Sequence, residues 1–286
     1  MSSVLFEHRL TLAGCETRAI ELDGKGPTLL LLHGFADSAD TWRTLLDRLR
    51  RDGRRAVALD LPGYATATPL EAGPILPQLD RFVDAALERF GGEGAVIVGN
   101  SLGGCVALRA AERHAELTGI IPIAPAGLSL ARWLAIVEGE LVIRLILSSP
   151  FPLPARAIRE AVAQVYKAMV FAHPRRVDPR VISAFTHHFS NREDVGRYLS
   201  NGKVLRRELD DPFDLERIRC PVLLVWGDRD RMVFTSGAER VLREVPHSRL
   251  EVIEDCGHCP QIEEPRRLSE LIEQFCAEPE AVTAAG

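Results

Sequence analysis

The chain has 286 residues, of which 46% are hydrophobic, enough to bury the core of one large α/β domain that carries an insertion. Its 35 lysines and arginines against 40 aspartates and glutamates give a formal net charge of -5, so no basic surplus is available for nucleic-acid phosphates. Residues 1–12 lack the apolar core of a signal peptide, and charges and prolines interrupt the apolar region 133–153. We therefore expect a globular cytoplasmic protein with no stable membrane insertion and no nucleic-acid partner.

Short apolar runs alternate with helical patterns along most of the chain. Each run is continuously apolar, which is typical of strands buried on both faces of a sheet, and between the runs apolar residues recur at helical spacing. This alternation predicts an α/β fold with a mostly parallel central sheet flanked by helices. The expected strands are residues 28–32, 56–59, 95–98, 117–123, 220–226 and 249–253, and the expected helices are residues 41–51, 75–90, 102–114, 235–243 and 265–276.

The alternation stops after residue 124 and resumes near residue 220. The stretch between contains two helical stripes of apolar residues, one over residues 158–169 and one over residues 177–189. We expect residues 1–124 and 213–286 to form the α/β core, and residues 125–212 to form an inserted helical cap.

A pentapeptide between an expected strand and an expected helix indicates a nucleophile. Gly99-Asn100-Ser101-Leu102-Gly103 has the G-x-S-x-G spacing of a sharp turn that exposes a serine hydroxyl above the sheet. Side chains at Gly99 and Gly103 would collide with the neighbouring strand or helix. The same letters also occur in ordinary loops, so the interpretation requires a base that accepts the serine proton and an acid that orients the base.

Two loops after later strands offer these partners, because reactive groups of a parallel sheet gather at the carboxyl ends of its strands. The loop after the strand at 220–226 contains Asp228 and Asp230, and the loop after the strand at 249–253 contains His258. An unperturbed imidazole titrates near pH ~6.5 and can act as base and acid near neutrality. Asp228 and Asp230 lie in one turn, and the residues alone leave both open as the orienting acid.

Cys256-Gly257-His258-Cys259 also matches the spacing of dithiol oxidoreductases. It lies near the carboxyl end and is followed by Pro260, whereas a redox motif of this kind opens a helix after an early strand. The chain has no second cysteine or histidine pair at a ligand spacing. We therefore expect neither a redox centre nor a metal site, and no organic cofactor.

Taken in order, these motifs resemble the landmarks of the α/β-hydrolase superfamily. The resemblance implies that Ser101 is the nucleophile, His258 the general base and Asp230 the orienting acid. It also implies an oxyanion hole made by the backbone N–H groups of Phe35 and Leu102. The matching segments are His33-Gly34-Phe35, residues 60–63, residues 99–104, residues 226–230 and Gly257-His258.

A serine at this position argues against epoxide or haloalkane chemistry, for which relatives carry an aspartate. We expect an acyl-enzyme hydrolase of a small to medium lipophilic carboxylic ester, with Trp133, Val137 and Leu141 of the cap as substrate-binding residues. One alternative is carbon-carbon bond hydrolysis of ring-fission diketones, because Asn100 resembles that branch, although residues 35–40 lack its glycine-rich stretch. A ligand-binding receptor, or a very slow hydrolase, is the other alternative.

Overall fold

The central sheet has eight strands in the order β1-β2-β4-β3-β5-β6-β7-β8. The computed structural model describes residues 5–92, 94–128, 143, 148 and 153–277. All neighbours from β4 to β8 pair in parallel, whereas β1 pairs with β2, and β2 with β4, in antiparallel fashion. The predicted α/β class with a mostly parallel sheet is therefore confirmed. The strands are β1 Leu5–Leu12, β2 Cys15–Leu22, β3 Lys25–Leu32, β4 Arg54–Leu59, β5 Ala95–Asn100, β6 Gly119–Ile123, β7 Val222–Gly227 and β8 Ser248–Ile253.

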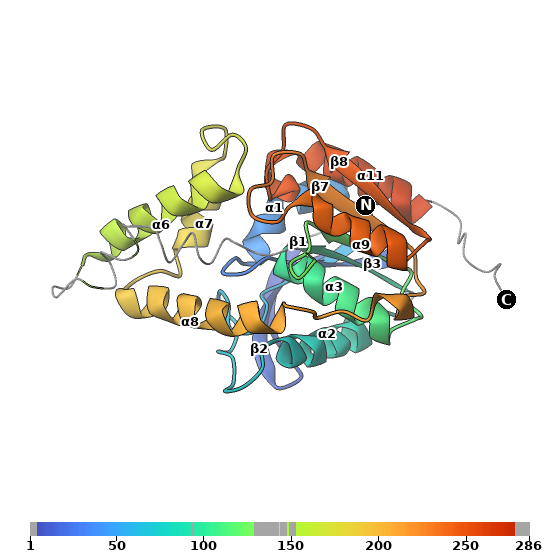
Figure 1. Ribbon diagram of the computed structural model, residues 1–286, viewed down its shortest axis with the longest axis horizontal. Coiled ribbons are helices and arrows are strands. Elements are labelled where there is room, and N and C mark those ends of the chain that lie inside the picture. The colour runs from blue at the N-terminus through green and yellow to red at the C-terminus, as the bar shows by residue number, and fades with distance from the viewer. Residues whose placement is uncertain (1–4, 93, 129–142, 144–147, 149–152, 278–286) are drawn as a thin grey trace.

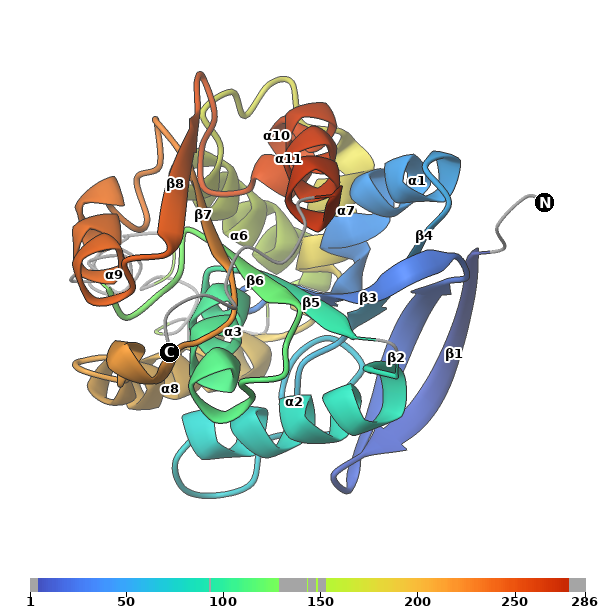
Figure 2. The same ribbon diagram turned by 90° about the vertical axis from the view of Figure 1, so that its right-hand side faces the viewer.

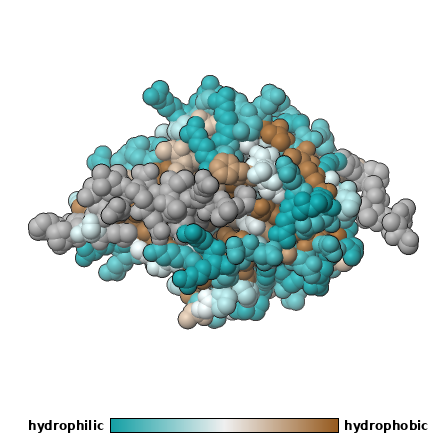
Figure 3. Space-filling model, in the orientation of Figure 1, coloured by the Kyte–Doolittle hydropathy of each residue, from teal (hydrophilic) through white to brown (hydrophobic). Residues whose placement is uncertain are grey.

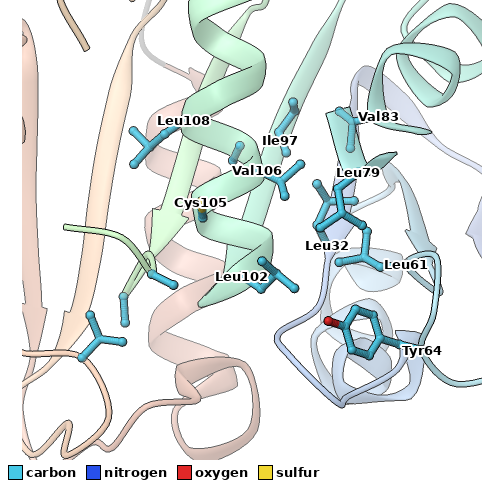
Figure 4. Packing of buried hydrophobic residues seen from close by; sticks show 14 of the residues in the cluster. Leu32, Leu61, Tyr64, Leu79, Val83, Ile97, Leu102, Cys105, Val106 and Leu108 are labelled. Atoms are coloured by element: carbon cyan, nitrogen blue, oxygen red, sulfur yellow. The ribbon is translucent and has the colours of Figure 1, made fainter. Parts of the chain in front are cut away.

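Helices cover both faces of this sheet (Figure 2). Helices α1 (Arg43–Arg51) and α11 (Pro265–Ala277) pack with Leu29 and Leu31 of β3. On the other face, α2 (Leu76–Phe90), α3 (Leu102–Arg113) and α9 (Ala238–Glu244) pack with Leu30 and Leu32 of the same strand. Figure 4 shows part of this second cluster, in which Leu79, Val83 and Val106 meet Leu32 and Ile97. Consecutive residues of β3 point to opposite faces, so both clusters need the strand to be apolar throughout.

The antiparallel hairpin of β1 and β2 is not among the strands that the sequence predicts. Its residues mix charged and apolar side chains, and most of β1 is exposed or half-buried, so the continuous apolar pattern of the central strands is absent. Two of the expected helices begin as 3₁₀ turns and not as α-helix. These turns are Ala39–Trp42, directly before α1, and Thr235–Gly237, directly before α9. A short helix, α10 (Pro260–Glu263), directly precedes α11.

The segment between β6 and β7 contains helices that lie toward the left in Figure 1. Its helices are α6 (Ala155–Val170), α7 (Pro179–Thr186) and α8 (Arg192–Glu208), and the 3₁₀ turn Leu215–Arg217 leads back to β7. The apolar stripe over residues 158–169 lies in α6, with Ile158, Val162 and Tyr166 buried. Helix α8 begins with a capping box between Asn191 and Asp194.

Polar side chains dominate the face shown in Figure 3, with apolar ones scattered between them. Large exposed apolar residues in the described part are Phe6, Leu153, Val204, Phe234, Leu242 and Val252. Within that part, none of the helices combines the length and the apolar character needed to cross a membrane. The cytoplasmic location stays a prediction from the sequence.

Candidate active site

The strand-to-helix turn at Ser101 has the sharp geometry that the pentapeptide predicts. Ser101 joins β5 to α3 with φ 55° and ψ -110°, a left-handed conformation that only surrounding contacts can maintain. Its N–H donates to the carbonyl of Ile123 at 2.9 Å. A Cβ atom at Gly99 would overlap the carbonyl of Gly103, and one at Gly103 would overlap that of Leu32. Only glycine therefore fits at positions 99 and 103.

His258 and Asp230 form a buried pair. Their side chains are 4% and 1% exposed, and Nδ1 of His258 lies 2.7 Å from Oδ2 of Asp230. Oδ1 of Asp230 accepts hydrogen bonds from the N–H groups of Met232 (2.7 Å) and Val233 (3.1 Å). Because a carboxylate accepts at Nδ1, this nitrogen carries the proton and Nε2 has a free lone pair. Nε2 is buried without a hydrogen-bond partner among the residues that the structure describes.

Asp228 does not reach His258. It is exposed, and its Oδ1 accepts a hydrogen bond from the N–H of Cys256 at 3.2 Å. The structure therefore brings Asp230, and not Asp228, to the imidazole.

Ser101 and His258 line one pocket, whose walls are otherwise mostly apolar. Helix α6 contributes Val162, Tyr166 and Met169, and the loop after β3 contributes residues 34–37. No lysine or arginine lies among the described lining residues. Trp133, Val137 and Leu141, the expected substrate-binding residues, lie outside the described residues.

The loop that carries Phe35 runs directly beside the serine. A Cβ atom on Gly34 would lie 3.4 Å from the Cβ of Ser101, and Phe35 lines the pocket. Leu102 is the first residue of α3, where backbone N–H groups have no acceptor within the helix. His33 is fully buried, and its Nε2 accepts from the N–H of Leu61 at 2.9 Å while Nδ1 lies 2.7 Å from the carbonyl of Gly34. Burial lowers the pKa of His33 to about 4, so a neutral imidazole braces this loop.

Asn100 connects the serine turn to the histidine loop. Its Nδ2 donates to the carbonyl of His258 at 2.9 Å, and its Oδ1 accepts from Nε2 of Gln261 at 3.1 Å. Both side chains are buried. The contact between Asn100 and Gln261 was not predictable, because these two residues are far apart in the chain.

Glu263 links the histidine loop to the end of α6. Its Oε1 accepts from the N–H of Gly257 at 2.8 Å, and its Oε2 accepts from the N–H groups of Ala172 (2.8 Å) and His173 (3.3 Å). The N–H of His258 donates to the carbonyl of Val170 at 2.8 Å in the same place. Burial raises the pKa of this carboxyl, and the three donors oppose that rise. We therefore regard Glu263 as a positioning residue for His258.

Glu263→Gln is expected to lower kcat several-fold and to reduce the free energy of unfolding by about 1–3 kcal/mol, because one of the two accepting oxygens becomes an N–H donor. Ester hydrolysis and thermal unfolding of the variant would be measured together. Glu264→Gln is the matched control, since Glu264 makes no side-chain hydrogen bond within the described part. Equal effects in both variants would contradict a specific role for Glu263.

Cys256 and Cys259 are free thiols, and both are buried. Burial raises the pKa of each thiol above its ordinary value. Reactive dithiols need the opposite, a lowered pKa in an electropositive setting, so the redox interpretation is disfavoured. Within the described residues, no three His, Cys, Asp or Glu side chains gather in a way that could hold a metal ion.

Asp37 is a buried carboxyl in the pocket wall that the sequence did not reveal as a site residue. It is 6% exposed, and its Oδ1 accepts from the N–H of Ser38 at 2.8 Å. Burial raises its pKa from 3.8 to about 7; the nearby Asp40 and Asp60 carboxylates add to the rise, and hydrogen bonds from Ser38 and Thr41 oppose it. Tyr166 and Cys259, whose own pKa values lie well above neutrality, are its other titratable neighbours.

Asp37→Asn is expected to stabilise the protein at alkaline pH. A carboxyl with a pKa raised from 3.8 to about 7 binds a proton more tightly in the folded state, so the wild type loses stability as pH rises between these values. Each pH unit in that window corresponds to about 1.4 kcal/mol, and asparagine avoids the loss. We expect a gain on the order of 3 kcal/mol at about pH 8.5 and little gain at about pH 4.5. Unfolding in urea at both pH values measures this difference, and a pH-independent effect would contradict it.

Comparison with known proteins identifies the family to which the chain belongs. The model of the alpha/beta hydrolase family matches residues 29–271, so the chain belongs to this family and is a hydrolase. It is 27% identical to monoacylglycerol lipase ABHD6 of Mus musculus over 89% of this chain and 76% of that one. It is 25% identical to 2-hydroxy-6-oxo-6-(2'-aminophenyl)hexa-2,4-dienoic acid hydrolase of Metapseudomonas resinovorans, over 99% and 95% of the two chains. The solved structure of a membrane phospholipase A matches with a TM-score of 0.78 at 26% identity, over 95% of this chain and 85% of that one.

Proposed function

We propose that this hydrolase cleaves small to medium lipophilic carboxylic esters through an acyl-enzyme on Ser101. The observation that carries the proposal is the buried Asp230–His258 pair, with Nε2 of His258 unpartnered in the described part, at the same apolar pocket as Ser101. The family relation and the lipase named among its relatives support ester chemistry.

In the proposed reaction, Oγ of Ser101 attacks the ester carbonyl while Nε2 of His258 takes the hydroxyl proton. Negative charge moves to the carbonyl oxygen, where the backbone N–H groups of Phe35 and Leu102 stabilise it. The carbon–oxygen bond to the alcohol then breaks, and His258 returns the proton to the departing alcohol. Water, deprotonated by His258, cleaves the acyl-enzyme and releases the carboxylic acid. Asp230 holds the imidazole in one orientation and stabilises its charged form.

In this proposal, residues 1–124 and 213–286 supply the catalytic groups, and residues 125–212 act as a cap. The described part of that cap contributes most of the apolar lining, including Val162, Met169 and Phe185. An acyl chain that enters this lining leaves water, which stabilises the bound state by about 0.8 kcal/mol for each buried methylene.

Hydrolysis of p-nitrophenyl acetate, butyrate and octanoate tests the proposal. We expect kcat/KM to rise with acyl length up to the medium-chain ester, because each added methylene contacts the apolar walls. Equal turnover of acetate and octanoate would contradict a lipophilic substrate. Mass spectrometry after treatment with a fluorophosphonate should locate the covalent adduct on Ser101.

Carbon-carbon bond hydrolysis is a second candidate, favoured by the nearly full-length similarity to the Metapseudomonas resinovorans hydrolase. The substrate in that relative's name is a dienoic acid and carries a carboxylate. The described lining here offers this carboxylate no lysine or arginine and instead contains Asp37. We therefore expect kcat/KM for that dienoic acid to be at least roughly a hundredfold below that for a neutral octanoate ester, and the reverse order would favour the second candidate.

A further inference from the structure

One residue of the pocket wall has a buried phenol hydroxyl without a partner in the described part. Tyr166 of α6 is 9% exposed and lines the pocket, and its Oη has no hydrogen bond to any described residue. Its ring is fixed, because it stacks on Phe185 with centroids 3.6 Å apart and meets Phe171 edge-on at 5.2 Å. Buried tyrosine hydroxyls usually have a partner, so the position is suited to a polar atom that arrives with a ligand.

Asp37 lies in the lining of the same pocket. Its carboxyl accepts from the N–H of Ser38, and the side chain of Thr41 and the carboxylates of Asp40 and Asp60 also act on it. The neighbouring cation, Arg18, is already bonded to Asp40 and Asp60. Asp37 also acts on Tyr166, since it contributes to the raised pKa of the phenol, for which burial is the larger cause. Asp37 and Tyr166 are therefore two polar side chains in the lining of one pocket whose wall is otherwise mostly apolar.

We propose that Asp37 and Tyr166 form a polar subsite that binds an uncharged alkyl hydroxyl of the ester substrate. A hydroxyl is the smallest group that can donate to the Asp37 carboxyl and accept from the Tyr166 O–H at the same time. An anionic group would instead meet a carboxyl with no cation in the described lining. This inference rests on the proposed ester hydrolysis and adds a specificity determinant to it.

The hydroxyl can belong to the alcohol portion or to the acyl chain, and two matched pairs of esters distinguish these sources. Hydroxyethyl octanoate and propyl octanoate differ by a hydroxyl in place of a methyl group in the alcohol. Propyl ω-hydroxyoctanoate and propyl nonanoate differ in the same way at the end of the acyl chain. We expect kcat/KM for the wild type, measured by pH-stat titration, to favour the hydroxylated member of one pair by about tenfold.

Tyr166→Phe keeps the ring packing and removes only the hydroxyl. It should therefore bring the ratio of kcat/KM between the hydroxylated and the methyl ester toward one. Asp37→Ala should do the same, and Tyr166→Phe keeps the experiment decisive where the alanine variant does not fold. Tyr198→Phe is the matched control, because Tyr198 also lines the pocket but its hydroxyl, unlike that of Tyr166, is not a buried atom without a partner. The Tyr198→Phe variant should prefer the hydroxylated ester as strongly as the wild type does.

The inference would be overturned if the wild type hydrolysed both members of each pair with equal kcat/KM. It would also be overturned if Tyr166→Phe kept the full preference for the hydroxylated ester. Neither result would contradict the proposed ester hydrolysis. The first of these results is expected if an ordered water satisfies the phenol. Absence of turnover for all four esters would overturn the proposed function and the subsite with it.

Discussion

Ser101→Ala is expected to lower kcat for ester hydrolysis by roughly 10⁴-fold or more, because no other hydroxyl occupies the strained turn between β5 and α3. The change removes one oxygen atom. The N–H of residue 101 still donates to Ile123, and Gly99 and Gly103 still allow the close approach of the backbone, so the fold should persist. Steady-state kinetics and the thermal unfolding midpoint of the purified variant measure both parts of this expectation.

Cys256→Ala is a useful companion variant, because a dithiol mechanism requires this thiol and acyl transfer does not. The variant should retain most of the activity that Ser101→Ala loses. The ligand-binding alternative predicts a different result. The wild type would then be as inactive as Ser101→Ala, and an ester would nevertheless raise its thermal unfolding midpoint.

Asp230→Asn is expected to lower kcat by roughly 10³- to 10⁴-fold with a much smaller change in KM. The N–H groups of Met232 and Val233 require an oxygen at the Oδ1 position, which directs the new amide nitrogen toward His258. Nδ1 must then accept a hydrogen bond, and the imidazole proton moves to Nε2. In that tautomer Nε2 has no lone pair to receive the proton of Ser101.

The control for this variant is Asp228→Asn, in the same turn. Asp228 is exposed and touches the histidine loop only through the N–H of Cys256, for which asparagine retains an accepting oxygen. We expect near wild-type kcat. If Asp228→Asn lost most of its kcat while Asp230→Asn stayed active, Asp228 and not Asp230 would be the acid that orients His258.

Continuous apolar runs made the parallel strands predictable, because nearly every side chain of a strand that is buried on both faces must be apolar. The hairpin of β1 and β2 was not predictable in this way, since it lies at the sheet edge and its exposed residues carry no buried pattern. The short helix α10 begins at Pro260 and spans too few residues for a helical period to show.

For the site, local motifs identified Ser101 and His258 as candidates, and the family resemblance favoured Asp230 over Asp228. The roles proposed for Asp37, Tyr166 and Glu263 could not be predicted from the sequence, for one physical reason. Each depends on contacts between segments far apart in the chain, and an isolated carboxylate or tyrosine on a helix is ordinary until the fold shows what surrounds it.

The hydrogen bonds at Glu263 have a consequence for how the pocket wall and the histidine loop are joined. They fasten the carboxyl-terminal end of α6 to the loop of His258, together with the bond from His258 N–H to Val170. A movement of α6 that preserves these hydrogen bonds must leave the end of the helix at Val170 next to the histidine loop. The backbone of His258 is thereby joined to the helix that supplies Val162, Tyr166 and Met169 to the pocket wall.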